Sequence, residues 1–291
     1  MALKGILPAL VTPFDAAGDT DFATLEKLIE HHLAQGVHGF VPMGSTGEYY
    51  AMTAGERADV LRCVKEVVGD RGQLVAGTNG GSTREVIGHT ETAKKLGYDT
   101  VLLPPPYYCL PTQEELLVHY RAVLDAVDVR VVLYNFPLRA GVEVGFDVMD
   151  ALADDPRVVA IKESSGNLLR ALEINRRYAG RLELSCGSDD QAFDFFMWGA
   201  TSWICGPANC FAGPIVRFYE AFVRGDQATA QALMRRIYPA MTDLESGKFV
   251  QKVKYGCELS GIAVGETRRP LMPLGPDEKA AFAQVFAAAH A

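Results

Sequence analysis

The chain has 291 residues, of which 48% are hydrophobic and 22% are charged. This composition is ordinary for a globular protein, and the length allows one barrel-sized domain or two smaller ones. The formal net charge of −8 and the isoelectric point near 5.3 argue against a nucleic-acid partner or an anionic membrane surface.

The sequence also lacks patterns typical of membrane proteins, of secreted proteins and of zinc sites. No apolar run approaches the roughly 18 residues of a membrane span, and residues 1–6 lead into a strand pattern without a signal-peptide core. The six cysteines are scattered, with no Cys-x-x-Cys pair and no histidine spacing typical of zinc. We therefore expect a cytoplasmic protein with reduced thiols and no membrane partner.

Strand and helix patterns alternate along the first 224 residues. Strands are expected at 6–11, 39–43, 74–77, 100–103, 130–134, 158–162, 182–185 and 202–205. Helices are expected at 22–33, 55–68, 83–96, 113–126, 146–153, 168–178, 191–198 and 214–223. Before the second helix, Thr53 and Glu56 form a capping-box pattern.

Eight strand–helix units with short connections predict an α/β fold, a (β/α)8 TIM barrel. A doubly wound open sheet is the alternative, but Thr12-Pro13-Phe14 is not the glycine-rich phosphate loop that usually follows its first strand. After Gly225, residues 228–238, 240–259 and 277–289 read as helices with no strand between them. We interpret residues 1–224 as the catalytic barrel domain and residues 225–291 as a C-terminal helical extension packed on it.

Residues 157–166 provide the first chemical signal. The apolar run from Val158 to Ile161 is typical of a strand buried on both faces, and it ends in Lys162. A lysine at the rim of a barrel would project into a partly apolar site, where burial disfavours the charged ammonium and the neutral amine becomes available for Schiff-base chemistry. A lysine that simply reaches water is the competing interpretation.

Other strand ends supply groups that suit such a lysine, since the carboxyl ends of barrel strands share one site. The residues expected there are Thr12, Ser45, Thr46, Asn79, Tyr107, Tyr108, Tyr134, Asn135, Lys162, Gly187, Ser188, Asp189 and Gly206. They include no set of aspartate, glutamate and histidine suited to a divalent metal, so a metal-free mechanism without a cofactor is expected.

Three motifs carry a family resemblance, at residues 44–48 (Gly-Ser-Thr-Gly-Glu), 134–137 (Tyr-Asn-Phe-Pro) and 161–166 (Ile-Lys-Glu-Ser-Ser-Gly). In order and spacing they resemble the signatures of the dihydrodipicolinate synthase / N-acetylneuraminate lyase family. The resemblance runs from about residue 4 to residue 285. It implies a Schiff-base lyase that acts on pyruvate or a related 2-oxo acid.

The resemblance also implies roles for individual residues. Lys162 would form the imine, Tyr134 would carry protons to and from the substrate, and Ser45 with Tyr108 would complete its relay. In the family the tyrosine at the position of Tyr108 comes from a neighbouring subunit, which implies a homodimer or homotetramer.

Substrate-binding roles follow in the same way. The turn from Gly44 to Gly47, with the hydroxyl of Thr46, would hold the carboxylate of the 2-oxo acid by hydrogen bonds. Ile204 would supply a backbone carbonyl near the substrate. Arg139 matches the arginine that binds the second substrate's carboxylate in the synthase branch, although a surface-loop arginine is the competing interpretation.

Departures from the synthase pattern bear on the substrate. Ser45 stands where the synthase branch typically has threonine, Ala140 where it has threonine, and residues 247–254 replace its Asn-Pro-x-Pro-Val-Lys stretch. Arg139 argues against sialic acid. We therefore favour a catabolic aldolase, dehydratase or deaminase acting on a 2-keto-3-deoxy sugar acid or a hydroxy-pyrroline carboxylate. The alternatives are 4-hydroxy-tetrahydrodipicolinate synthase and a non-catalytic barrel that binds a 2-oxo acid.

Regulation by lysine is not expected. At the positions of the family's allosteric lysine site the chain has Tyr49, Tyr50, Ala54, Arg57 and Gly81, with Glu85 and Tyr107 retained. Two bulky tyrosines would fill the space and an arginine would repel the ammonium of the ligand, so too few partners remain for a desolvated amino acid.

Overall fold

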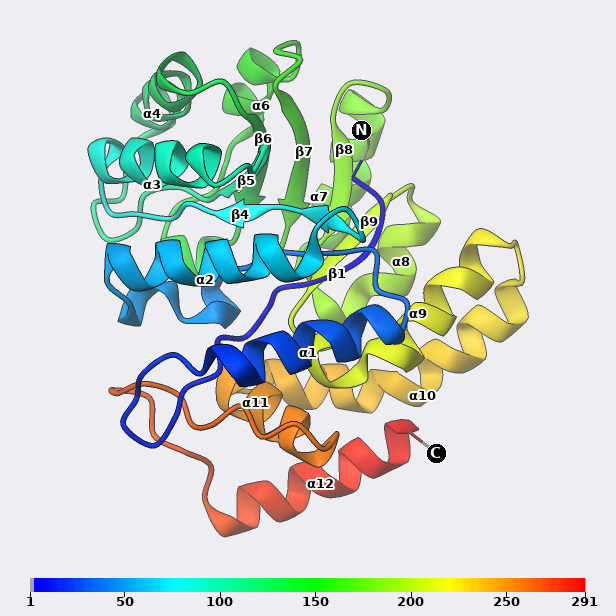
Figure 1. The fold of residues 1–291 in the computed structure, drawn as a ribbon. Coiled ribbons are helices and arrows are strands. Elements are labelled where there is room, and N and C mark those ends of the chain that lie inside the picture. The colour runs from blue at the N-terminus through cyan, green and yellow to red at the C-terminus, as the bar shows by residue number, and fades with distance from the viewer. Residues whose placement is uncertain (1–2, 291) are drawn as a thin grey trace. The chain divides into compact units, whose positions relative to one another are not determined.

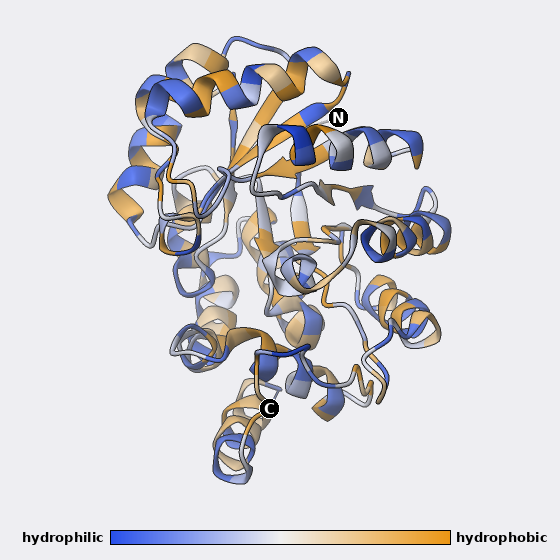
Figure 2. Cartoon of the chain, turned by 90° about the vertical axis from the view of Figure 1, so that its left-hand side faces the viewer, coloured by the Kyte–Doolittle hydropathy of each residue, from blue (hydrophilic) through white to orange (hydrophobic). Residues whose placement is uncertain are grey.

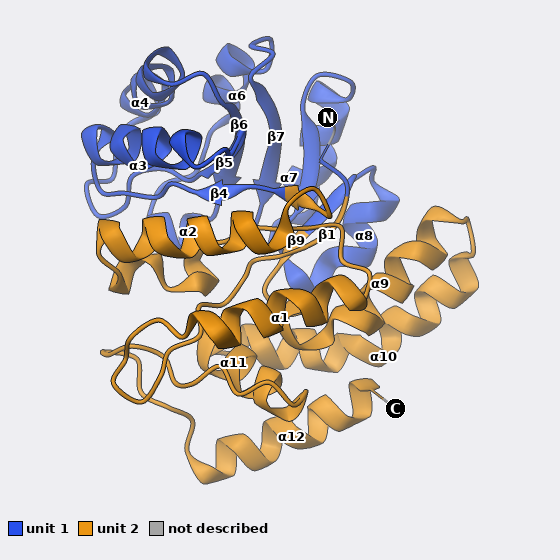
Figure 3. Ribbon diagram, in the orientation of Figure 1, with its two compact units in different colours: residues 1–4, 74–203 blue, residues 5–73, 204–291 orange. Residues whose placement is uncertain are grey.

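The computed structural model describes residues 3–290 (Figure 1). Strands of mostly hydrophobic residues alternate with helices that carry both hydrophilic and hydrophobic residues (Figure 2). The chain divides into two compact units (Figure 3). Unit 1 comprises residues 1–4 and 74–203, and unit 2 comprises residues 5–73 and 204–291.

Unit 1 is built on parallel strands in the order β9–β8–β7–β6–β5–β4. The strands are β4 (Ala76–Gly77), β5 (Thr100–Leu103), β6 (Arg130–Asn135), β7 (Val158–Glu163), β8 (Glu183–Cys186) and β9 (Ser202–Cys205), the last two residues of β9 belonging to unit 2. The helices are α3 (Thr83–Lys95), α4 (Gln113–Ala126), α5 (Pro137–Ala140), α6 (Phe146–Leu152), α7 (Leu168–Tyr178), η3 (Asp189–Gln191) and α8 (Ala192–Met197). Almost every residue of β5, β6 and β7 is buried, as their continuous apolar runs predict.

Unit 2 contains the remaining strands, the first two helices and the C-terminal helices. The strands are β1 (Gly5–Pro8), β2 (Gly39–Phe40) and β3 (Gln73–Leu74), whose last residue belongs to unit 1. The helices are η1 (Ser45–Gly47), η2 (Tyr49–Ala51), α1 (Phe22–Ala34), α2 (Ala54–Val68), α9 (Ala208–Val223), α10 (Gln227–Glu245), α11 (Phe249–Leu259) and α12 (Pro276–His290). α9, α10, α11 and α12 pack against one another.

Eight strand positions alternate with helices, and the fold is a (β/α)8 TIM barrel followed by a C-terminal helical extension, as predicted. The third strand position holds β3 and β4, separated by Val75. The capping box before α2 is confirmed, since the Thr53 side chain accepts the Glu56 N–H and the Glu56 carboxylate accepts the Thr53 N–H. The domain boundary at residues 224 and 225 stays a prediction.

Two predicted helix boundaries near prolines are wrong. α9 starts at Ala208 instead of Pro214, with a kink at Phe211, where φ is −126°. Pro214 has no N–H to give the carbonyl of Cys210, which instead accepts a hydrogen bond from the Ser260 hydroxyl at 3.4 Å.

The second wrong boundary concerns α10. This helix continues through Pro239 because the proline lies on its exposed side, while Ile237, Met241 and Leu244 are buried. The break comes later, at Gly247, where φ is +128°. The segment predicted as one helix over 240–259 is therefore the end of α10 and the whole of α11.

Candidate functional site

Lys162 is the fifth residue of β7 and lies beside Tyr134 of β6 in the parallel register. Its Nζ is 4.4 Å from the centroid of the Tyr134 ring. Lys162 is 6% exposed and Tyr134 is 5% exposed. In the part of the chain that the structure describes, Lys162 forms no ion pair with a carboxylate. A shielded amine next to a phenol has the surroundings expected of a Schiff-base nucleophile.

Neighbouring strands surround this lysine with small side chains. Ser185 of β8 pairs with Lys162 in the register, and Ser202 of β9 pairs with Ser185, both with no exposed surface. At Gly187, a Cβ would lie 2.9 Å from the backbone carbonyl oxygen of Glu163 and 2.8 Å from Lys162 Cε. Glycine is therefore required there. Sequence reasoning placed Gly187 at a strand end, but it missed this contact and both serines.

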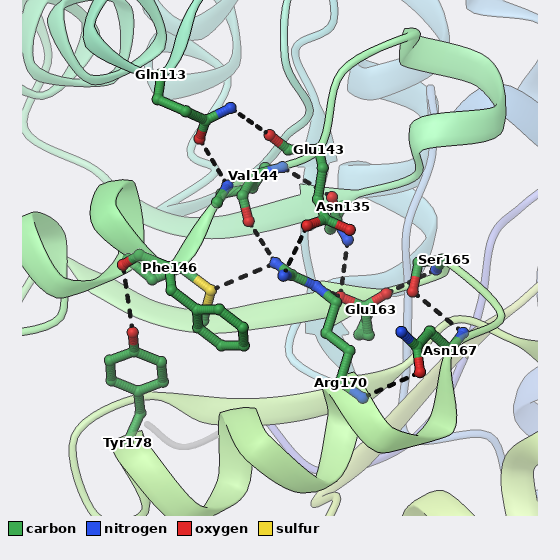
Figure 4. A network of polar contacts seen from close by, with 12 residues as sticks. Gln113, Asn135, Glu143, Val144, Phe146, Glu163, Ser165, Asn167, Arg170 and Tyr178 are labelled. Atoms are coloured by element: carbon green, nitrogen blue, oxygen red, sulfur yellow. Dashed lines mark hydrogen bonds and ion pairs between the residues drawn. The ribbon is translucent and has the colours of Figure 1, made fainter.

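On the opposite face of the same strands, Asn135 and Glu163 are fully buried and paired in the register. Asn135 Nδ2 donates to Glu163 Oε2 at 2.8 Å, and Arg170 Nε donates to the same oxygen at 3.0 Å (Figure 4). Asn135 and Glu163 are the residues that directly follow Tyr134 and Lys162 in the sequence. The sequence carried no local signal for this polar network, because Arg170 reaches back from α7.

Tyr108 and Arg139 also belong to unit 1. Tyr108 is 96% exposed and has a φ of +72°, which is rare outside glycine. Arg139 lies on α5 with its guanidinium carbon 5.4 Å from the centroid of the Phe136 ring. Within residues 3–290, neither makes a hydrogen bond or ion pair with Lys162 or Tyr134.

In unit 2, residues 44–48 form a turn rather than an extended loop. Gly44 precedes η1, and its carbonyl accepts the N–H of Gly47 at 3.0 Å. The Thr12 hydroxyl donates to the carbonyl of Gly47 at 2.7 Å. A Cβ at Gly47 would lie 2.8 Å from a backbone oxygen, so only glycine fits there. Thr46 is 7% exposed and Ser45 is partly buried.

Glu48 ends this turn and makes a buried ion pair. Its Oε1 lies 2.8 Å from Lys254 Nζ, with the two side chains 0% and 2% exposed. Its Oε2 accepts the backbone N–H of Arg268 at 2.9 Å. Burial lowers the pKa of Lys254 from its ordinary value, and the Glu48 carboxylate opposes that shift. Glu48 therefore has a structural role.

Phe249 is a residue near this turn that sequence reasoning did not single out. A Cβ at Gly206 would lie 2.5 Å from the Phe249 ring and 3.4 Å from Thr46 Oγ1. The ring edge therefore lies against Gly206, close to the hydroxyl of Thr46. Ile204, two residues before Gly206 on β9, is fully buried.

The structure brings the predicted residues together within each unit. Lys162 and Tyr134 are neighbours in unit 1, and Gly44, Ser45, Thr46 and Gly47 share one turn in unit 2. Among residues 3–290, no three histidine, cysteine, aspartate or glutamate side chains gather as metal ligands. None of the described helices combines the length and hydrophobicity needed to cross a membrane. All six cysteines are free thiols, and burial raises the pKa of Cys63 to about 11 and of Cys257 to about 12.

A buried lysine at the carboxyl end of a barrel strand, beside a tyrosine, is the arrangement expected of a Schiff-base lyase on a (β/α)8 barrel. Comparison with known proteins names the family. Residues 2–289 match the model of the dihydrodipicolinate synthetase family, and the chain belongs to that family of lyases.

Three relatives illustrate the similarity. The 4-hydroxy-tetrahydrodipicolinate synthase of Pelobacter propionicus is 36% identical over 287 residues, covering 97% of both chains. The chloride-inhibited dihydrodipicolinate synthase of Acinetobacter baumannii, solved as a complex with pyruvate, is 32% identical with a TM-score of 0.96, covering 99% of both chains. The dihydrodipicolinate synthase of Cyanidioschyzon merolae, solved with lysine bound, is 30% identical with a TM-score of 0.94, covering 99% of this chain and 98% of that one.

Proposed function

We propose that this lyase condenses pyruvate with aspartate semialdehyde, the reaction of a 4-hydroxy-tetrahydrodipicolinate synthase. The observation that carries the imine chemistry is the Lys162 amine, buried beside the Tyr134 ring without a carboxylate partner in the described chain. The choice of reaction is supported by relatives of that name at 36% identity over nearly the whole length. From the sequence alone, the synthase reaction was the alternative and a catabolic reaction was favoured; the relatives reverse that order.

The proposed steps consist of additions, proton transfers and loss of water, so they require no redox cofactor. The Lys162 amine adds to the keto carbon of pyruvate and water leaves, giving an imine. The methyl group then loses a proton, and the resulting enamine carbon attacks the aldehyde. Tyr134 carries the protons with Ser45 and Tyr108. The amino group of the second substrate then attacks the imine carbon and displaces the lysine amine, which closes the ring of the product and returns the free lysine. Because the imine nitrogen accepts the electron pair, this route requires no metal.

The binding roles are part of the same proposal. The turn from Gly44 to Gly47 and the hydroxyl of Thr46 hold the carboxylate of pyruvate, and the carbonyl of Ile204 faces the substrate. Arg139 binds the carboxylate of the second substrate. Tyr108, 96% exposed in one chain, completes the relay of a neighbouring copy, so the enzyme is a dimer or tetramer. A cytoplasmic location is part of this proposal.

A borohydride experiment tests the imine. Incubation with pyruvate and borohydride should add a reduced pyruvyl group to the peptide that contains Lys162. The chain supplies its own control, because Lys254 is equally buried but its amine is bound by Glu48 and by the carbonyl of Glu266 at 2.9 Å. The Lys254 peptide should stay unmodified. No adduct on Lys162 in folded protein would favour the non-catalytic barrel.

A catabolic lyase remains the second candidate, and specific residues favour it. Ser45 and Ala140 depart from the synthase pattern, and the Phe249 ring lies near Thr46. A substrate panel decides between the two candidates. Turnover of pyruvate with aspartate semialdehyde supports the synthase, whereas cleavage or dehydration of a 2-keto-3-deoxy sugar acid, or deamination of a hydroxy-pyrroline carboxylate, supports the catabolic enzyme.

A further inference from the structure

The segment Glu143–Gly145 lies shortly after α5, the short helix that carries Arg139. Gln113, the first residue of α4, holds this segment at two backbone atoms. Its Nε2 donates to the carbonyl of Glu143 at 2.9 Å, and its Oε1 accepts the N–H of Gly145 at 2.8 Å. A Cβ at Gly145 would lie 2.4 Å from Gln113 Oε1, so a glycine is needed for this contact.

Val144, in the middle of the segment, is held from the strand side. Its N–H donates to Asn135 Oδ1 at 2.9 Å, and its carbonyl accepts a hydrogen bond from the Arg170 guanidinium. Arg170 also pairs with Glu143 Oε1 at 3.0 Å and with Glu163, so its planar group joins three segments of the chain. Figure 4 shows the guanidinium at the centre of these contacts.

The same network is fixed to the strands that carry the reacting groups. Side chains alternate between the two faces of a strand, so Tyr134 and Lys162 face one way and the residues after them face the other. Glu163 accepts hydrogen bonds from Asn135 and Arg170 on one oxygen and from the N–H of Ser165 at 2.6 Å on the other. Arg170 and Glu163 side chains are 4% and 0% exposed.

We propose that Arg170 and Gln113 are positioning residues that set the affinity for an anionic second substrate, by fixing the segment that follows α5, the short helix that carries Arg139. This inference rests on the proposed function of Arg139. α5 ends at Ala140, Gly141 follows with a φ of +74°, and only two more residues separate Gly141 from the anchored Val144. So short a connection limits how far Arg139 can move. Neither positioning residue takes part in imine formation.

The test compares Gln113→Ala and Arg170→Lys with Arg157→Lys as control. Arg157 lies at the opposite end of the β7 segment, where it pairs with Asp155 and donates to the carbonyl of Leu124 at 2.6 Å. Both test variants should raise the KM for aspartate semialdehyde by roughly 10-fold or more, because small misplacements of a binding group are costly. The KM for pyruvate and the amount of borohydride adduct on Lys162 should stay within about 3-fold of wild type. In the control Arg157→Lys, the KM for aspartate semialdehyde should also stay within about 3-fold of wild type.

Amide hydrogen exchange supplies a readout that needs no substrate. Residues 139–145 should exchange faster in Gln113→Ala, with the amides of β7 unchanged. Gln113 is partly exposed and bears no charge, so this variant remains informative if Arg170→Lys fails to fold.

Two results would overturn the proposal while the wild type is active. They are unchanged exchange at 139–145 in Gln113→Ala, and an equal loss of pyruvate trapping and of affinity for aspartate semialdehyde in the test variants. Two results in the wild type would instead refute the proposed function on which the inference rests. Absence of any pyruvate adduct would refute the imine, and an adduct without turnover of the aldehyde would refute the synthase reaction but leave the imine at Lys162 intact.

Discussion

Two strand exits of this protein use the same device for different tasks. The exit of β7 in unit 1 ends in Glu163, and the exit of β2 in unit 2 leads to Glu48. Both glutamates are fully buried, and each pairs with a cation that is at most 4% exposed. At the β7 exit the cation is an arginine, whose fork binds several groups at once, whereas at the β2 exit it is Lys254, a point charge.

The difference shows which groups each exit leaves available. At the β7 exit the network binds the outward side chains, and the inward Lys162 and Tyr134 face each other without an ion pair in the described chain. At the β2 exit the ion pair fixes a turn of glycines and hydroxyls. We therefore propose that the first exit carries the chemistry and that the second binds the carboxylate, and the predictions below test that division.

Removing the Tyr134 hydroxyl should have the largest effect. Tyr134→Phe should keep the fold and still bind pyruvate, but kcat should fall by roughly 10²–10⁴-fold, the usual contribution of a positioned acid–base group. Steady-state kinetics measures this. Tyr120→Phe is the control, because Tyr120 is equally buried on α4. Near wild-type turnover in Tyr134→Phe would mean that Tyr134 serves only in packing.

Thr46→Val should act on binding instead. Loss of one hydrogen bond to a carboxylate should raise the KM for pyruvate roughly 10- to 100-fold, with kcat changed little. The control is Thr90→Val, whose hydroxyl donates to the carbonyl of Val86 within α3. A fall in kcat at constant KM would place Thr46 in the chemical step and contradict the division between the two exits.

The sequence predicted the fold, and it placed the candidate residues Lys162 and Tyr134 at strand ends, because both features have local patterns. Apolar runs mark the buried strands, and Lys162 follows directly on one of them. The buried ion pairs beside the two strand exits could not be predicted from the sequence. Arg170 is seven positions from Glu163, and Lys254 is more than two hundred positions from Glu48. The effect of Pro214 and Pro239 on the helices could not be predicted either, because tertiary packing decides it. At Pro214 the missing hydrogen bond to the Cys210 carbonyl is replaced by one from Ser260, and at Pro239 the proline lies on the exposed side of α10.

The free energy of unfolding should also depend on pH, through Glu56 in the first turn of α2. Hydrogen bonding to Arg268 lowers the pKa of Glu56 from 4.5 to about 2. The lowered pKa stabilises the fold above about pH 4.5, and this contribution is lost as the pH falls towards 2. Because solvent screens the partly exposed carboxylate, we expect about 1 kcal/mol.

Urea unfolding of Glu56→Gln between pH 5 and pH 2 measures this contribution, with about 1 kcal/mol less pH dependence expected than in wild type. Glu66→Gln, an exposed glutamate on the same helix, is the control and should follow the wild type. Identical curves for Glu56→Gln and wild type would show that the Arg268 contact contributes nothing to stability.

The smallest effect is expected from L-lysine. Arg57 is 5% exposed and lies with its guanidinium carbon 5.2 Å from the centroid of the Tyr49 ring, and the Tyr49 and Tyr50 rings are 5.7 Å apart. These groups occupy the positions where the family's lysine site would lie, and a buried arginine repels the ammonium of the ligand. We predict no binding in calorimetry and no inhibition in a steady-state assay at millimolar lysine. The Cyanidioschyzon merolae enzyme, solved with lysine bound, is the positive control for binding. Saturable inhibition would contradict this prediction, and would strengthen the biosynthetic interpretation over the catabolic one.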